Sequence, residues 1–247
     1  MAVLIGHAVS DENGSIDKTG QSIEGDQTGK EICTRHFYVR TGGWHSYLQP
    51  IDIGKGMIAA RYMKEICDDD AFGYSQSKRK TGYKAIEANG GKVHGASGSF
   101  DCSSLVMTCL KEAGFNVSVD AYTGNMVKKI LASGEFTLHT SKDYTADDEH
   151  ALPGGVWVGD GHTCMALEAG SGSPTPIIGP YVEVIGGSVI IRQGAGKEYP
   201  KLTTAHKGDH LPYIETDEDT GWYWIESNKG IGCITNKLKY TKLVLLE

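Results

Sequence analysis

Two residues of this sequence have the types and the surroundings of a nucleophile and its base. Cys102 follows a glycine- and serine-rich loop at 95–100 and precedes an apolar stretch at 103–113, whose pattern and closing Gly114 predict an α-helix. The cysteine is therefore expected at a helix N-terminus, where the partial positive charge of the helix lowers a thiol pKa and favours the reactive thiolate. His162 lies sixty residues further on, at the glycine-rich start of a predicted strand. A cysteine at a helix start and a histidine at a strand end form the arrangement of a Cys–His hydrolase.

Each of these residues also has an ordinary structural interpretation. A cysteine in an apolar helix is usually a packed core residue, and we interpret Cys109, in the same predicted helix, in that way. A single histidine is more often structural or solvent-exposed than catalytic. The combination of Cys102 and His162, in this order and with these flanking residues, favours catalysis.

The two segments resemble the signature motifs of a known family. Phe100–Leu105 and Gly161–Thr163 are similar to the cysteine and histidine motifs of the NlpC-type cysteine peptidases and the related phage amidases. These are papain-like enzymes that cut the peptide part of bacterial cell walls. Ser10–Gly14, Gly25–Glu31 and, more loosely, Gly73–Gln76 resemble a branch of this superfamily found in phages of Gram-positive bacteria.

The resemblance covers about residues 2–168 and implies a fold and a reaction. The fold is α+β and papain-like, with an antiparallel sheet packed on the Cys102 helix. Cys102 would attack a peptidoglycan amide as the thiolate, His162 would take and return the proton, and water would release a thioacyl enzyme, without a metal or a cofactor. Family members cut either the muramoyl–L-alanine amide or a bond inside the stem peptide, and the sequence leaves both open. A wall-binding protein with an inactive catalytic domain, and a toxin acting on a different amide, are the alternative functions.

A Cys–His pair usually needs a third polar residue that orients the imidazole. In the family this residue lies on the strand after the histidine strand, but here that position runs into a Gly/Ser/Pro-rich segment. Glu168 would share a strand face with His162, but about 20 Å along it, which is too far for contact. The stretch Val3–Val9 resembles the family's follower strand and contains His7. We therefore predict a circular permutation in which the first strand pairs beside the histidine strand and delivers His7; the alternative is a solvated histidine near the terminus.

Further candidates for the site come from polar loop residues near these motifs. The Cys102 backbone N–H is a candidate oxyanion donor, because helix N-termini present free amides. Asp101 either caps the helix or orients backbone amides, and capping is the simpler role. The candidates for substrate binding are Asp101, Ser103, Asp26, Gln27 and Tyr74. Polar loop residues of this kind are more often turn formers.

The pattern along the chain predicts its elements and its division into domains. Helices are expected at about 51–67 and 123–133, and a short strand at 3–5. Gly, Ser and Pro dominate a predicted linker at 170–181. The linker separates a cysteine hydrolase domain at residues 1–169 from a second domain at 182–247.

The second domain is predicted to be a small all-β barrel, because short β-type runs alternate with turn residues. Ser188–Tyr199 and Gly221–Ile225 resemble a bacterial SH3-type domain, and in that family such domains bind cell walls. The candidate wall-binding residues are Trp222, Tyr223 and Trp224. The alternative is a packing module that only holds the catalytic domain.

Composition narrows the possible partners and locations. A net charge of −7 argues against nucleic acid as a partner. No apolar run is long enough for membrane insertion, and the N-terminal residues lack the regions of a signal peptide. We therefore expect synthesis in a host cytoplasm and action on the wall after release. The six cysteines contain no CxxC pair, which predicts free thiols and no structural zinc. The oligomeric state stays open.

Overall fold

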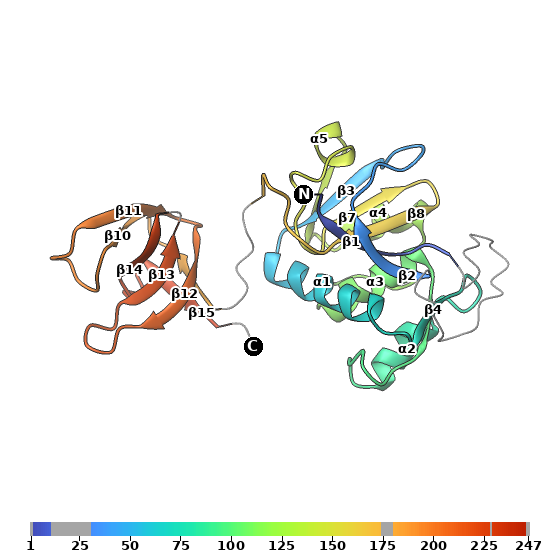
Figure 1. Cartoon of the computed structure of the whole chain (residues 1–247), viewed down its shortest axis with the longest axis horizontal. Helices are drawn as coiled ribbons and strands as arrows, with labels where there is room; N and C mark the ends of the chain where they lie inside the picture. Colours follow the sequence, from blue (N-terminus) through green and yellow to red (C-terminus); the bar gives the residue numbers. More distant parts are fainter. Residues whose placement is uncertain (1, 11–30, 174–179, 228, 246–247) are drawn as a thin grey trace. The chain divides into compact units, whose positions relative to one another are not determined.

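The computed structural model describes residues 2–10, 31–173, 180–227 and 229–245. The chain divides into two compact units, residues 1–176 and 177–247. Each unit has its own sheet and its own hydrophobic core (Figure 1). None of the helices in the described part of the chain is long and apolar enough to cross a membrane.

The N-terminal unit is built on a six-stranded sheet in which every neighbouring pair is antiparallel. In spatial order its strands are β2 (Ile32–His36), β1 (Leu4–Ala8), β8 (His162–Ala166), β7 (Val156–Gly159), β3 (Ser46–Pro50) and β6 (Phe136–His139). A separate parallel pair, β4 (Phe72–Tyr74) and β5 (Gly98–Phe100), leads the chain to the cysteine helix. The first strand of the chain thus lies inside the sheet, beside the strand that begins at His162.

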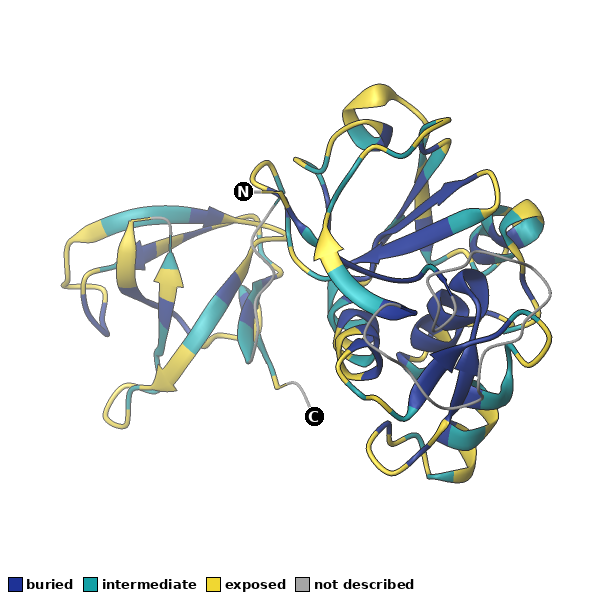
Figure 2. Cartoon of the chain, turned by 45° about the vertical axis from the view of Figure 1, so that its right-hand side comes forward, coloured by how far each residue is buried: buried dark blue, intermediate teal, exposed yellow. Residues whose placement is uncertain are grey.

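Five helices accompany this sheet in the described residues: α1 (Ile53–Cys67), α2 (Thr81–Ala88), α3 (Cys102–Glu112), α4 (Thr123–Leu131) and α5 (Lys142–Thr145). α3 packs against α1 and β8, and α1 also packs against β1. All residues from Cys102 to Leu110 are buried (Figure 2). A helix whose first nine residues are all buried, polar Ser103, Ser104 and Thr108 included, lies in the interior of its domain. α3 therefore forms a rigid, water-excluded support for the residue at its N-terminus.

β1 fits between its neighbours because it carries a glycine where α1 crosses it. A Cβ atom on Gly6 would collide with the side chain of Met63. At the start of the strand, the Leu4 N–H donates to Glu168 Oε2 at 3.0 Å. The close packing of Gly6 on Met63 and the hydrogen bond from Leu4 to Glu168 thus hold β1 in its register, which fixes the position of His7.

Several elements expected from the sequence are present. α1 and α4 confirm the two helices predicted at about 51–67 and 123–133. β1 confirms the short strand predicted at 3–5 and extends it through His7. Of the predicted linker at 170–181, residues 174–179 lie outside the described residues.

The C-terminal unit is a seven-stranded, antiparallel arrangement in the described residues. In spatial order its strands are β11 (Lys201–His206), β10 (Ser188–Arg192), β14 (Gly230–Ile234), β13 (Tyr223–Ser227), β12 (His210–Thr216), β9 (Tyr181–Val184) and β15 (Thr241–Val244). Its core consists of Val182, Val184, Val189, Ile191, Ala205, Leu211, Ile225 and Ile234. In β9 and β10 the more buried residues alternate with less buried ones, as expected when one sheet face packs on a core.

Candidate active site

Cys102 is the first residue of α3 and its position is fixed by a reciprocal cap. The Asp101 carboxylate accepts from the Ser104 backbone N–H at 2.7 Å, and the Ser104 hydroxyl accepts from the Asp101 N–H at 2.9 Å. This capping box satisfies two amides at the helix start. The first i→i−4 bond runs from Leu105 N to Asp101 O, so the amide of Cys102 lies ahead of the helical ladder.

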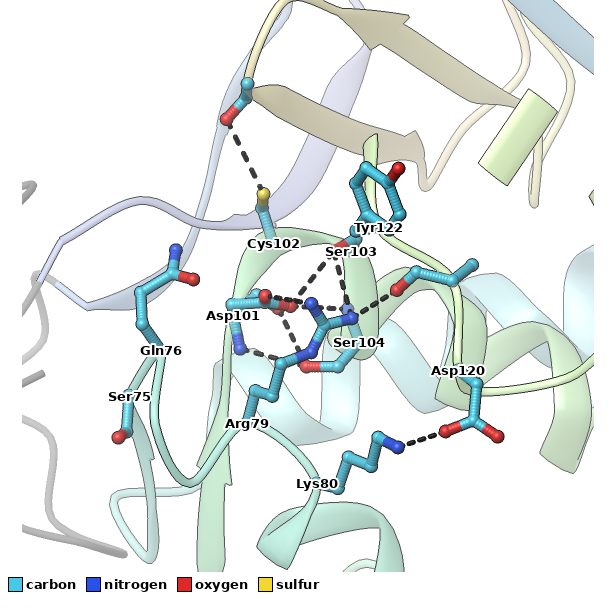
Figure 3. Close-up of polar contacts among 12 residues, drawn as sticks. Ser75, Gln76, Arg79, Lys80, Asp101, Cys102, Ser103, Ser104, Asp120 and Tyr122 are labelled. Atoms are coloured by element: carbon cyan, nitrogen blue, oxygen red, sulfur yellow. Dashed lines mark hydrogen bonds and ion pairs between the residues drawn. The ribbon is translucent and has the colours of Figure 1, made fainter. Parts of the chain in front are cut away.

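A half-buried arginine, Arg79, ties this cap to the surrounding loops (Figure 3). The Arg79 guanidinium forms an ion pair with the Asp101 carboxylate at 2.8 Å and donates to the Ser103 hydroxyl at 3.3 Å. It also donates to the carbonyl of Ala121. The Asp101 side chain is only 4% exposed, so the carboxylate depends on these partners rather than on water. Arg79 thus holds the helix start that presents Cys102.

The sulfur of Cys102 faces the turn that precedes His162. The thiol lies 3.9 Å from the Gly161 carbonyl oxygen, as the dashed line from the sulfur in Figure 3 shows. Gly161 has a φ of +70°, a conformation that glycine adopts without strain. The tight β7–β8 turn therefore brings the first residue of β8 to the first residue of α3.

His7 and His162 lie on the same face of the sheet and touch. Ile5 pairs with Ala166 in the β1–β8 ladder, so their side chains lie on one face of the sheet. His7 is two residues from Ile5 and His162 is four residues from Ala166, and side chains an even number of residues apart on a strand share a face. The two imidazoles are joined by His7 Nδ1 and His162 Nε2 at 3.1 Å. His7 is fully buried, which differs from the alternative of a solvated terminal histidine.

This contact determines which nitrogens can carry protons. His162 Nε2 faces His7, so Nδ1 is the nitrogen left for the Cys102 thiol. A neutral imidazole carries a proton on only one of its two nitrogens. If Nδ1 of His162 is to accept the thiol proton, the ring proton must lie on Nε2, which then donates to His7 Nδ1. The proton of His7 then lies on Nε2, which is buried and has no hydrogen-bond partner among the described residues. In that state the hydrogen bond between the two imidazoles has one direction, from His162 Nε2 to His7 Nδ1.

The site is neutral at rest. Burial raises the pKa of the Cys102 thiol to about 12, and the adjacent Asp101 carboxylate adds to this. Burial lowers the pKa of His162 to about 4, with further lowering by Arg40 and Arg35. It lowers the pKa of His7 to about 3, with His162 and Arg35 contributing. The lowered thiol pKa expected from the helix N-terminus is therefore wrong, because the loss of water around the sulfur outweighs the partial charge of the helix.

The other predicted residues of the N-terminal unit are placed as follows. Asp101 and Ser103 are buried and paired within the Arg79 network, and their contact with a substrate remains a prediction. Tyr74 is buried and its hydroxyl accepts from the Gln76 amide at 2.6 Å. Glu168 is hydrogen-bonded to the start of β1, away from His162. Asp26 and Gln27 lie outside the described residues.

The three candidate wall-binding residues, Trp222, Tyr223 and Trp224, are all partly exposed. Tyr223 packs against the core of that unit and meets Tyr213 edge-to-face at 5.9 Å between ring centroids. Hydrogen bonds from Thr220, with a smaller contribution from the Trp224 side chain, lower the pKa of the Asp217 carboxyl. Trp222 and Trp224 are not among the residues packed on the described core of this unit.

Sequence reasoning missed four residues that surround the catalytic candidates: Arg79, Arg35, Arg40 and Trp44. Arg79 follows the Gly73–Gln76 motif closely, and that position was the signal that could have indicated it. The other three lie on β2 and the loop after it, where no motif marks them. Among the described residues, no group of three or more His, Cys, Asp or Glu side chains is arranged to hold a metal ion.

No curated protein matches the chain. A family model described as an endolysin-like domain matches residues 5–173, a range that includes β1, α3 and β8 and more than half of the chain. The match indicates a phage-type cell-wall lytic function with peptidoglycan as the substrate. The chain belongs to the endolysin-like domain family.

Proposed function

We propose that this protein is a cysteine peptidoglycan hydrolase that cuts an amide of the bacterial wall. The observation that carries the proposal is the convergence of three distant segments, α3, β8 and β1, on Cys102, His162 and His7. Each supplies the group that amide hydrolysis requires: a nucleophile, a base and a group that orients the base.

The neutral resting state sets the order of events. His162 Nδ1 takes the thiol proton as the sulfur attacks the amide carbon, and the Cys102 N–H stabilises the oxyanion. The imidazolium then gives this proton to the leaving amine, which leaves a thioester. Water attacks the thioester with His162 again as base, and the thiol is restored. His7 supports the imidazolium by accepting from Nε2, and its own neutrality keeps a second charge out of the buried site.

The arrangement of strands supports a circularly permuted, papain-like catalytic unit of the NlpC type. In the described residues, the chain leaves β8 at Ala166 and adds no following strand beside it. β1 occupies that position and supplies the third polar residue. His162 lies on the last strand described in this unit, and the first strand of the chain supplies the residue that orients it.

Fragment analysis of digested walls tests the activity and names the bond. Purified walls treated with the wild type should release new amino groups, on alanine for a muramoyl–L-alanine amidase or on the third residue for a stem-peptide endopeptidase. Cys102→Ala should release none. Cys109→Ala is the matched control, because it removes a buried thiol from the same helix without touching the site. Release by Cys102→Ala at anything near the wild-type rate would refute the mechanism. An inactive wall-binding protein, or a toxin acting on another amide, would release nothing even as the wild type.

We further propose that residues 182–247 form an SH3-type unit that binds the wall through Trp222 and Trp224. The separate core of this unit supports independent folding, and aromatic faces suit stacking on sugars or peptides. The isolated fragment should co-sediment with walls. A Trp222→Ala/Trp224→Ala variant should not, whereas Leu238→Ser, at an exposed apolar position of the same unit, should. A wild-type fragment that stays in the supernatant would make the unit a packing module.

A further inference from the structure

Two arginines stand beside the catalytic histidines. Arg35 lies on β2 opposite Ile5, which places it on the same sheet face as His7 and His162. Arg40 lies in the loop after β2, and its guanidinium donates to the Asp160 carbonyl at 2.6 Å, at the turn before His162. Both arginines therefore approach the site from the side opposite to α3 and Arg79.

Aromatic rings hold these two cations in place. The Trp44 ring lies 5.9 Å from the His162 ring, and the Tyr38 ring lies 6.2 Å from the His7 ring, measured between centroids. The Arg35 guanidinium lies 4.2 Å above Tyr38, and that of Arg40 lies 5.6 Å from the centre of Trp44. Contacts of this kind fix the guanidinium planes without neutralising their charge.

Neither cation has a carboxylate partner within the described part of the chain. By contrast, Arg61 pairs with Glu65, and Arg79 pairs with Asp101. The absence of a partner is notable in a chain of net charge −7. The two charges also disfavour protonated His162, which is the state the reaction must form. A bound anion would remove this penalty when substrate is present.

We propose that Arg35 and Arg40 form a carboxylate-binding subsite that recognises the free α-carboxylate of the stem peptide's D-glutamate. This inference rests on the proposed function. The D-glutamate is linked through its side chain, so its α-carboxylate stays free and lies within one residue of either candidate amide. A guanidinium fork matches a carboxylate in two parallel hydrogen bonds. The enzyme would thus select walls whose glutamate is not amidated.

Matched soluble substrates test the subsite. Three muramoyl tetrapeptides, built with the third residue of a wall that the wild type lyses, carry D-glutamate, D-isoglutamine, or D-glutamate with a C-terminal carboxamide. For the wild type, kcat/KM should fall about tenfold to a hundredfold from the first to the second, in the range of a charge-assisted hydrogen bond. It should stay unchanged for the third, because the C-terminal carboxylate is not the group recognised.

Variants separate the subsite from the chemistry. Arg35→Gln and Arg40→Gln should bring the ratio of kcat/KM between the D-glutamate and the D-isoglutamine substrates down toward one, whatever their effect on the rate of the chemical step. Arg61→Gln is the matched control, since Arg61 also lies over a tyrosine ring but on α1, and it should retain full discrimination. Equal wild-type rates on the first two substrates, or a loss only on the third, would overturn the subsite while leaving the hydrolase intact. Failure of the wild type to release amino groups from any wall would instead overturn the proposed function.

Discussion

The Asp101 carboxylate beside Cys102 is paired with several groups, whereas polar and charged groups around His162 lack such partners in the described residues. The Asp101 carboxylate meets a guanidinium, a hydroxyl and a backbone amide. On the other side, the buried Nε2 of His7 has no hydrogen-bond partner in the described residues, and Arg35 and Arg40 have no counter-ion there. On the first side only Arg79 Nε lacks a partner among the described residues, whereas the second side keeps two cations and one N–H donor available for groups that arrive with the substrate. Substitutions on the two sides should therefore have different main effects: a loss of activity around His162 and a loss of stability around Asp101.

The largest effect should come from the unpaired side. His162→Ala should reduce kcat/KM by about 1,000-fold to 10,000-fold, because no other group can take the thiol proton. Initial rates of amino-group release measure this. The urea midpoint should hardly change, since His162 lies at a strand end. A variant within about tenfold of the wild type would remove His162 from the mechanism.

On the paired side, substitution should cost stability first. Arg79→Met leaves a buried carboxylate without its counter-ion and should lower the free energy of unfolding by about 3–5 kcal/mol, as measured by urea denaturation. Lys80→Met is the matched control, because it breaks the exposed pair with Asp120 next door, and it should cost no more than about 1 kcal/mol. Equal losses of unfolding free energy for the two variants would show that the Asp101–Arg79 pair stabilises the fold no more than an exposed ion pair does.

His7 should affect turnover more than binding. His7→Phe keeps the ring volume but removes the acceptor for His162 Nε2, and we expect a loss of about a hundredfold in kcat with KM unchanged. His7→Asn should recover part of this loss, because its side-chain oxygen can accept the same proton. If the phenylalanine variant turned over like the wild type, the contact between the two imidazoles would be structural only.

A further effect is a pH dependence of stability. The pKa values of His7 and His162 lie at about 3 and about 4 in the folded protein, below the unfolded value of 6.5. The unfolded chain then binds more protons below pH 6.5, so stability is full above that pH and falls as the pH drops toward the folded values. Each histidine contributes a slope of at most about 1.4 kcal/mol per pH unit. Urea midpoints measured between pH 7 and pH 4 should fall less steeply for His7→Phe than for the wild type; parallel curves would contradict the burial of a neutral His7.

The sequence allowed some of this structure to be predicted because local chemistry determined it. The uniform apolar run after Cys102 and the turn residues before His162 are local signals, and α3 and β8 begin where those signals place them. The likeness of Val3–Val9 to a follower strand also predicted that β1 lies beside β8, and the pairing of these two strands confirms this. The catalytic roles of Cys102, His162 and His7 remain predictions.

The parts that sequence could not supply depend on three-dimensional context. The raised pKa of Cys102 follows from burial by the whole fold, which no local motif encodes. Arg79 reaches Ser103 across a separation of 24 residues. Arg35 and Arg40 come to the site only because β2 lies at the edge beside β1. Long-range contacts of this kind carry no periodicity for a single sequence to display.

The position of β1 inside the sheet has a consequence for how the protein comes into being. His7 and His162 are separated by 155 residues, so a growing chain holds the first histidine long before the strand that must receive it. β1 can be enclosed on both sides only after β8 has left the ribosome. Contacts of such long sequence separation slow folding, because the chain must first close a large loop. A chain that ends before β8 therefore lacks an assembled site, even though it already contains His7 and Cys102.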